Sequence, residues 1–284
     1  MCARAERLIG VSLALGSALL WGCADFFGGS LSRRIPVLAV TLISQGIGFV
    51  GLLAVFAVEH HITWSSFRFG LGAGVGGAVG LALFYWGLSI GTMSIVAPIV
   101  ACSAIVPFTL ALIGGERPST LALTGAALAI AGIVIASLEE RRVDVPARAR
   151  AVVIAIAAAV AIGVFVYFLG RGGQSGSALS TLLGARIVSL FLLGAAALAA
   201  RTTLRQPRLT VAQAGAVGVA DLAANGMFAI AANHGLLAIV SVLGSVYPVA
   251  TVLLAHVVLG ERITWVQRAG VVCALTGVAF VSAG

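Results

Sequence analysis

Residues 115–137 read GERPSTLALTGAALAIAGIVIAS, and residues 260–282 read GERITWVQRAGVVCALTGVAFVS. Both stretches begin with Gly-Glu-Arg after a long apolar run, and the later matches keep the same register. They pair Gly125 with Gly270, Gly132 with Gly277 and Ser137 with Ser282. Upstream, after a shift of one residue, Phe84, Gly91 and Ile95-Val96 match Phe228, Gly235 and Ile239-Val240. The chain is therefore an internal duplication.

The composition indicates a membrane protein. Of the 284 residues, 61% are hydrophobic and only 9% are charged, with a mean hydropathy of +1.14. Such a chain cannot surround an ordinary core with a water-facing surface. Because a bilayer needs roughly 20 apolar residues per helix, the sequence predicts an all-α polytopic protein. About ten transmembrane helices are expected, at residues 8–30, 37–58, 67–90, 94–114, 119–138, 150–170, 178–200, 212–233, 238–259 and 264–283.

The net charge of +8 comes from 17 basic residues, all of them Arg and mostly in short connections. This distribution is typical of the positive-inside rule, not of nucleic-acid binding, so we expect lipid and no nucleic acid as partners. Successive connections lie on alternate sides of the membrane. One side then holds the larger set of arginines, Arg33, Arg34, Arg141, Arg142, Arg148, Arg150, Arg201, Arg205, Arg208, Arg262 and Arg268. The side that holds the termini has the smaller set, Arg4, Arg7, Arg68, Arg117 and Arg171. The rule then places both termini outside the cytoplasm.

The longest polar run lies near the middle of the chain and predicts the boundary between the copies. We expect a first repeat at residues 1–140, a linker at 141–149 and a second repeat at 150–284. Each repeat holds five spans. Because five is odd, the copies must have opposite orientations, related by a pseudo-two-fold axis in the membrane plane. Inverted repeats are typical of secondary transporters, whose sites lie near mid-membrane.

Short motifs occur in an order seen in a known family: Trp21-Gly22, Ile95-Val96-Ala97-Pro98, Ile239-Val240-Ser241, Tyr247-Pro248, and the Gly-Glu-Arg triplet of both copies. Over nearly its whole length the chain resembles the drug/metabolite transporter superfamily, specifically its ten-helix EamA-like members. The resemblance implies a solute carrier whose cavity is lined by the first, third, fourth, sixth, eighth and ninth helices. It also implies a small-molecule substrate, with amino acids and other metabolites among the cargoes.

No motif for catalysis or for a cofactor accompanies these spans. A phosphate-binding loop is excluded because the chain contains no Lys. Residues 72–77, GAGVGG, fit the dinucleotide pattern but lie inside an apolar span, where their spacing suits helix packing in lipid. The cysteines Cys23, Cys102 and Cys273 lack metal-ligand spacing, and no hydrolase motif occurs. We expect no cofactor, no metal and no enzymatic activity.

Three charged residues lie deep in the predicted spans: Asp25, Arg186 and Asp221. A charge at the bilayer centre costs about 2.5 to 3.5 kcal/mol on insertion scales, so each should face a cavity or a partner. Asp221 can pair with Arg186 on the adjacent helix or contact cargo or a proton directly, and the sequence leaves both open. Arg186 takes the position that Gln45 holds in the first repeat, which favours a structural role.

Helical spacing surrounds the two acids with polar and aromatic side chains. Asp221, Asn225 and Phe228 follow i, i+4, i+7 on one face, and Ser17, Trp21 and Asp25 follow i, i+4, i+8. An aromatic ring beside a carboxylate can hold an ammonium group. An ammonium-bearing cargo is therefore favoured. Tyr85 is a further candidate, although interfacial anchoring or packing is the favoured explanation for it.

Prolines inside spans free backbone carbonyls, and Pro98, Pro107 and Pro248 are so placed. We expect these helix breaks to line the cavity, together with Ser241, Ser245 and Tyr247. Ser241 can instead bond back to its own helix. Glu116 and Glu261 close one span in each repeat and are expected to serve in helix connections, not as cargo ligands.

The predicted mechanism is alternating access, with the two repeats rocking about a central cavity and Asp25 or Asp221 carrying a coupled proton. Export of small metabolites is the primary interpretation. Small multidrug-resistance proteins of the same superfamily use a membrane Glu in their first helix, and Asp25 lies there in this chain, so cationic drug efflux is the alternative. A membrane scaffold is the alternative without transport. Arg without Lys is typical of GC-rich bacteria and places the chain in a bacterial inner membrane.

Overall fold

The computed structural model describes residues 2–90, 96, 99–100, 102–136, 145–259 and 264–283. Every regular element within these ranges is a helix. The helices are α1 (Cys2–Ser32), α2 (Val37–Glu59), α3 (Trp64–Ile90), η1 (Cys102–Ala104), α5 (Ile105–Ile113), α6 (Thr120–Ala136), α7 (Val145–Gln174), α8 (Ala178–Ala199), α9 (Arg208–Asn233), α10 (Leu237–Gly244), α11 (Tyr247–Leu259) and α12 (Trp265–Ala283). The predictions for Pro98 and Glu261 concern positions outside the described residues.

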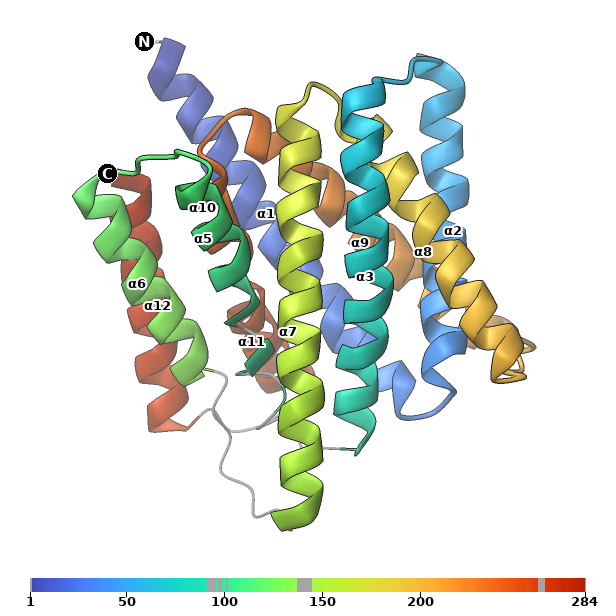
Figure 1. Cartoon of the computed structure of the whole chain (residues 1–284). Coiled ribbons are helices and arrows are strands. Elements are labelled where there is room, and N and C mark those ends of the chain that lie inside the picture. The colour runs from blue at the N-terminus through green and yellow to red at the C-terminus, as the bar shows by residue number, and fades with distance from the viewer. Residues whose placement is uncertain are drawn as a thin grey trace.

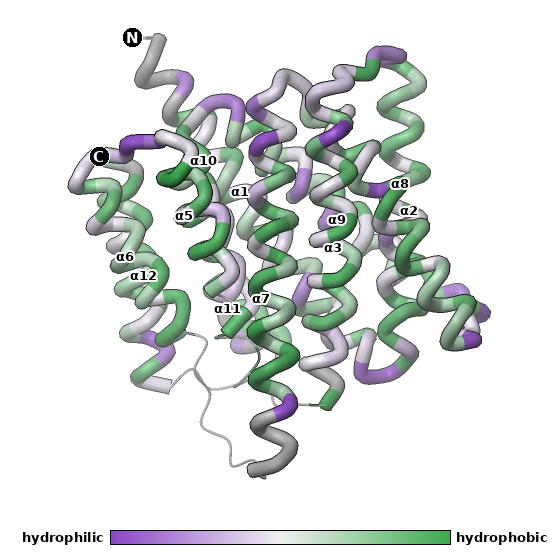
Figure 2. The backbone as a smooth tube through the Cα atoms, in the orientation of Figure 1, coloured by the Kyte–Doolittle hydropathy of each residue, from purple (hydrophilic) through white to green (hydrophobic). Residues whose placement is uncertain are grey.

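The described helices occupy all ten predicted spans (Figure 1). Seven are long and apolar enough to cross a bilayer, counting α10 and α11 as one span. Three shorter apolar helices lie in the fourth, fifth and tenth positions, at Cys102–Ile113, Thr120–Ala136 and Trp265–Val281. Figure 2 shows apolar residues along the helices and hydrophilic ones mainly near their ends. The prediction of an all-α polytopic membrane protein is confirmed.

Packing between the two repeats is pseudosymmetric. Helix α3 packs along α7, and α1 and α9, their counterparts in the other repeat, pack along each other. In the same way α3 packs on α8 and α9 packs on α2, while α6 packs on its own counterpart α12. Helices α6 and α12 run in opposite directions, and both termini lie at one end of the molecule (Figure 1). The predicted pair of inverted five-helix repeats is confirmed.

The duplicated glycines lie where α6 crosses α12. A Cβ atom on Gly132 would lie 2.2 Å from the backbone nitrogen of Ala274, and one on Gly277 would lie 2.3 Å from the nitrogen of Ala129. Two helix backbones can approach this closely only where no side chain intervenes. The glycines that identify the duplication are therefore packing residues that join the two repeats.

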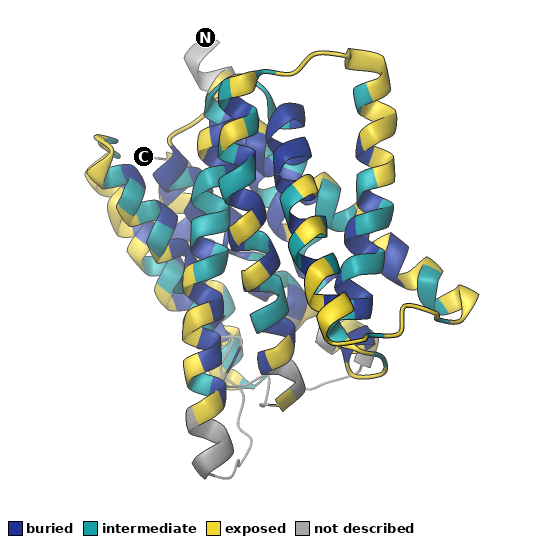
Figure 3. Ribbon diagram, turned by 45° about the vertical axis from the view of Figure 1, so that its right-hand side comes forward, coloured by how far each residue is buried: buried dark blue, intermediate teal, exposed yellow. Residues whose placement is uncertain are grey.

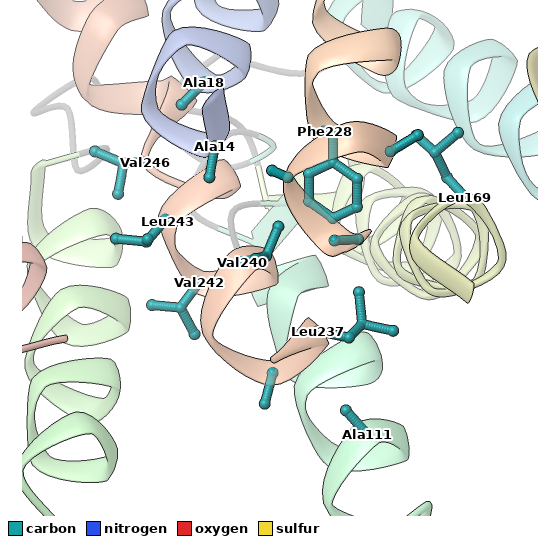
Figure 4. Close-up of a cluster of buried hydrophobic side chains, with 14 of the residues drawn as sticks. Ala14, Ala18, Ala111, Leu169, Phe228, Leu237, Val240, Val242, Leu243 and Val246 are labelled. Carbon is teal, nitrogen blue, oxygen red and sulfur yellow. The ribbon is translucent and has the colours of Figure 1, made fainter. Parts of the chain in front are cut away.

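The ninth span is broken into two helices. Helix α10 ends at Gly244 and α11 begins at Tyr247. Pro248 has no N–H to donate to the carbonyl of Gly244, so the helix cannot continue through this point. The buried side chains of α10 belong to an apolar cluster with residues of α1, α5, α7 and α9 (Figure 4). The break thus lies deep in the protein.

Large apolar side chains cover the outside of the bundle. Phe191, Leu198 and Val257 are 73%, 81% and 78% exposed. Figure 3 shows exposed residues along the outer helix faces and buried ones toward the interior. This outer surface suits contact with lipid tails.

Apart from Arg186, which is buried inside α8, the described arginines lie at or near the ends of the helices, in two unequal groups. The ends of α1 and α8 and the starts of α7, α9 and α12 lie opposite the termini (Figure 1). They carry Arg33, Arg34, Arg150, Arg201, Arg205, Arg208 and Arg268. The guanidinium groups of Arg150 and Arg268 lie 5.5 and 5.7 Å from the ring centroids of Trp86 and Trp265, as expected at a membrane interface.

Candidate functional site

A cavity of about 910 Å³, part of it open to solvent, lies between the two repeats. The acidic and basic side chains of its lining are Asp25, Arg186 and Asp221. Aromatic side chains form part of its wall, at Trp21, Phe84, Phe165 and Tyr247. The remaining polar lining residues are Gln45, Ser103, Ser189, Asn225, Ser241 and Ser245.

Arg186 is held by partners on two other helices. Its Nη2 donates to Asp221 Oδ2 at 2.6 Å, and its Nη1 donates to Gln45 Oε1. The arginine side chain is only 4% exposed, whereas that of Asp221 is 24% exposed. The pairing of Asp221 with Arg186, one of the two alternatives that the sequence left open, is therefore present in the structure.

Asn225 extends this network toward α1. Its Nδ2 donates to Asp221 Oδ2 at 3.1 Å, and its Oδ1 accepts a hydrogen bond from Trp21 Nε1 at 3.0 Å. A continuous chain of hydrogen bonds thus connects Trp21 to Gln45 through Asn225, Asp221 and Arg186. It joins α1 and α2 of the first repeat to α8 and α9 of the second.

Asp25 stands apart from this network. It lies one helical turn from Trp21, is half-buried and lines the cavity. Among the described residues it has no hydrogen-bond or ion-pair partner. Within the described part of the chain, Asp25 is therefore the cavity acid that no other side chain engages.

The broken ninth span contributes hydroxyl groups to the cavity. Ser245 Oγ donates to the carbonyl of Val242 at 2.8 Å. Ser241 is 1% exposed, and its Oγ has no hydrogen-bond partner among the described residues. Within the described part of the chain the hydroxyl of Ser241 is thus unpaired, whereas that of Ser245 is bonded to its own helix.

Several predicted site residues lie outside the cavity lining. Phe228 is fully buried behind Trp21, with 5.3 Å between the two ring centroids. Tyr85 is 3% exposed and packs against Gly28. Pro107 is buried in α5, and Pro248 is buried beside the break without reaching the lining. These four side chains are buried in the packing of the bundle and do not line the cavity.

Two helices that the family resemblance did not include also line the cavity. Helix α2 contributes Gln45, and α8 contributes Arg186 and Ser189. One indication of these two helices was present in the sequence, because Gln45 and Arg186 are long polar side chains at equivalent positions of α2 and α8. Ser103 and Phe165 carried no signal in the sequence, and Phe84 appeared there only as the repeat counterpart of Phe228.

The donor set of the cavity suits an organic cation. Two carboxylates and one guanidinium give it a negative net charge when all are ionised, and no group of three or more His, Cys, Asp or Glu that could hold a metal occurs among the described residues. Aromatic rings and one free carboxylate bind ammonium groups.

Comparison with known proteins adds a family and a fold. The model of the EamA-like transporter family matches twice, at residues 8–138 and 149–283. No curated protein matches the chain. A solved structure titled only "Crystal structure of protein" is similar with a TM-score of 0.73, covers 95% of each chain and is 17% identical. This likeness supports the fold alone.

Proposed function

Because the chain belongs to the EamA-like transporter family, we propose that it exports small ammonium-bearing metabolites, amino acids and simple amines among them, by alternating access. The family makes it a membrane transporter of the drug/metabolite type. The cargo class, the direction and the setting in a bacterial inner membrane are parts of this proposal.

The free carboxylate of Asp25 is the observation that carries the choice of cargo. Arg186 already has Asp221 and Gln45 as partners, so it has little capacity left for the carboxylate of a cargo. Asp25 lacks a partner among the described residues, so in a membrane its carboxyl group must either bind a proton or be balanced by a bound cation. A positively charged amine satisfies this requirement.

Trp21 adds selectivity for organic cations. It lines the cavity one turn from Asp25, and its indole is held by Asn225 and by Phe228. A ring fixed on two sides loses little freedom when cargo binds, and its face attracts an ammonium group. The carboxylate of an amino acid would rely on hydroxyls such as that of Ser241, which is a weaker site than a free Arg.

Asp25 also offers a route for coupling. A carboxylate that binds either a proton or an ammonium group, but not both, exchanges one for the other across the membrane. Asp221 is less suited to this role because releasing it would break its pair with Arg186. The proposed cycle therefore exchanges protons for cargo at Asp25.

The packing suggests which parts move. Helix α3 packs on α7 and α8, and α9 packs on α1 and α2, so each cluster contains helices of both repeats. Rocking of these two clusters keeps the largest interfaces intact. We therefore assign the motion to α3-α7-α8 against α1-α2-α9 and not to one whole repeat against the other.

Efflux of cationic drugs is the second candidate. The same acid in the first span and the same aromatic wall would accept large hydrophobic cations. Cargo size distinguishes the two candidates.

Flux into proteoliposomes tests the proposal, with matched cargo pairs. Phenylethylamine is compared with its uncharged N-acetyl derivative and with phenylalanine, and cationic dyes represent drugs. Saturable amine flux that disappears in Asp25→Asn, with none for the N-acetyl derivative, supports the proposal. Flux restricted to dyes supports drug efflux. Equal flux of charged and acetylated amines would refute the role of Asp25.

A further inference from the structure

The carboxylate of Glu116 binds the first turn of α10, a helix of the other repeat. Its Oε1 accepts a hydrogen bond from the Leu237 N–H at 3.0 Å, and its Oε2 accepts one from the Ala238 N–H at 2.8 Å. The residue before the helix, Leu236, provides no side-chain cap. A carboxylate here satisfies two N–H groups that lack intrahelical acceptors and complements the helix dipole.

The backbone that presents Glu116 has a fixed turn. The N–H of Glu116 donates to the carbonyl of Ala111, and that of Gly115 donates to Leu112, both at 3.1 Å. Gly115 has φ of +100°, which side chains disfavour, so the turn that ends α5 requires glycine there. The Gly-Glu pair thus directs the carboxylate toward α10.

The end of α7 also takes part in this contact. Gln174 Nε2 lies 3.5 Å from Glu116 Oε1, and Arg171 Nη1 donates to Gln174 Oε1 at 3.0 Å. Helix α7 contacts α10 directly, because a Cβ on Gly170 would lie 2.2 Å from Leu237 Cδ1. Glu116 therefore connects three segments: the α5–α6 connection, the end of α7 and the start of α10.

Helix α10 links this contact to the cavity. Ser241, Gly244 and Ser245, at its other end, line the cavity. The helix has only eight residues and ends at the break before Pro248, so it can move as a short rigid unit. A change at its first turn would displace the cavity wall about two turns away.

Connections at this same end of the molecule are hydrogen-bonded across the repeats. The Thr63 N–H donates to Ser180 Oγ at 2.9 Å, and the Ser177 N–H donates to Ser66 Oγ at 3.1 Å. The described connections at the opposite end, residues 33–36 and 200–207, make no hydrogen bond to the other repeat. Among the described connections, those at the end that holds Glu116 are therefore the ones bonded across the repeats.

We propose that Glu116 is a latch that holds α10 against α5 and α7 and keeps this end of the cavity closed. The proposal rests on the transport function proposed above. During the cycle the two bonds to α10 break as this end opens, and they form again as it closes. Glu116 acts on the equilibrium between the two conformations and does not contact cargo.

Distances between spin labels test the latch without any cargo. The full chain, with its four cysteines replaced, receives labels at Trp64→Cys and Leu236→Cys, two exposed positions. Glu116→Ala removes both acceptors and is expected to raise the population of longer distances by about tenfold, because charge-assisted hydrogen bonds are lost. Glu116→Gln keeps one acceptor and should give a smaller increase.

The matched control is Glu6→Gln at the same end. Glu6 pairs with His234 at 2.7 Å but is 56% exposed, so its loss should leave the distances unchanged. An unchanged distribution in folded Glu116→Ala, or in Glu116→Gln if the alanine variant does not fold, overturns the latch. If Glu116→Ala shifts the distances but the protein transports none of the tested cargoes, the latch is supported and the transport proposal is refuted.

Discussion

Arg186 and Gln45 occupy equivalent positions in the two repeats and are hydrogen-bonded to each other. Each is the ninth residue of its helix, counted from Ala178 in α8 and from Val37 in α2. The duplication thus placed two long polar side chains where the repeats meet. Because only one of them is charged, the pair can hold one acid, and Asp221 fills that role.

Removing Arg186 alone should destabilise the protein more than removing the whole ion pair. Arg186→Gln leaves Asp221 charged without its partner and is expected to cost about 3 kcal/mol of stability. Arg186→Gln with Asp221→Asn replaces the pair by neutral amides and should recover most of this loss. Unfolding of the single and double variants in detergent measures the difference. Equal loss in both would contradict a mutual pairing.

Trp21→Phe should weaken cargo binding more than it weakens the fold. The substitution keeps an aromatic ring against Phe228 but leaves Asn225 Oδ1 without its donor. Without the bond to Asn225 the ring is no longer fixed in place and must be ordered when cargo binds, so the KM for an amine should rise roughly tenfold. Trp265→Phe, at an 82% exposed position, is the matched control and should leave KM unchanged.

The fold was predictable because its determinants are repeated and periodic. The Gly-Glu-Arg triplets and the glycines of α6 and α12 revealed the duplication, and ten spans followed from hydropathy. The boundaries at 1–140, 141–149 and 150–284 stay predictions. Helix α7 already begins at Val145, inside the segment predicted as a linker. A helix that extends out of the bilayer can begin within a polar stretch, so the polar stretch alone does not give the start of the helix.

The site was predictable only as far as one helix face can be read from sequence. Spacing placed Asp221, Asn225 and Phe228 on one face of α9, but Phe228 lies about 10 Å along the helix from Asp221. There the neighbour is Trp21 and not the cavity. Asp25 has no partner among the described residues, and this depends on distances between helices. The spacing of residues along one helix cannot predict such distances.

Gly132→Ala should destabilise the α6–α12 pair. The added methyl would meet the backbone of Ala274, which cannot move independently, so a loss of about 2 kcal/mol is expected. Gly46→Ala is the matched control, because a Cβ at that helical position meets nothing within 4 Å and should be neutral or slightly stabilising. Thermal unfolding of both variants compares them. An equal effect would contradict close packing as the role of Gly132.

Both termini should lie outside the cytoplasm. The end of the molecule opposite the termini carries most of the described arginines, and the positive-inside rule keeps that end in the cytoplasm. A single cysteine at Arg201, in a chain without its native cysteines, should be protected from an impermeant thiol reagent in intact cells. A cysteine at Arg117 should react. The reverse pattern would show the opposite orientation.

Exchange at Asp25 should be electroneutral. If the carboxylate carries a monovalent amine in one direction and a proton in the other, no net charge crosses the membrane in a cycle. An acidic exterior should then drive amine export, because protons bind outside and release the cargo there. A membrane potential imposed with potassium and valinomycin should leave the rate unchanged. Asp25→Glu keeps the exchanging group and should retain pH-driven flux, whereas Asp25→Asn should lose it. Flux that follows the potential would instead require uniport of the cation, and the proton would then have no part in the cycle.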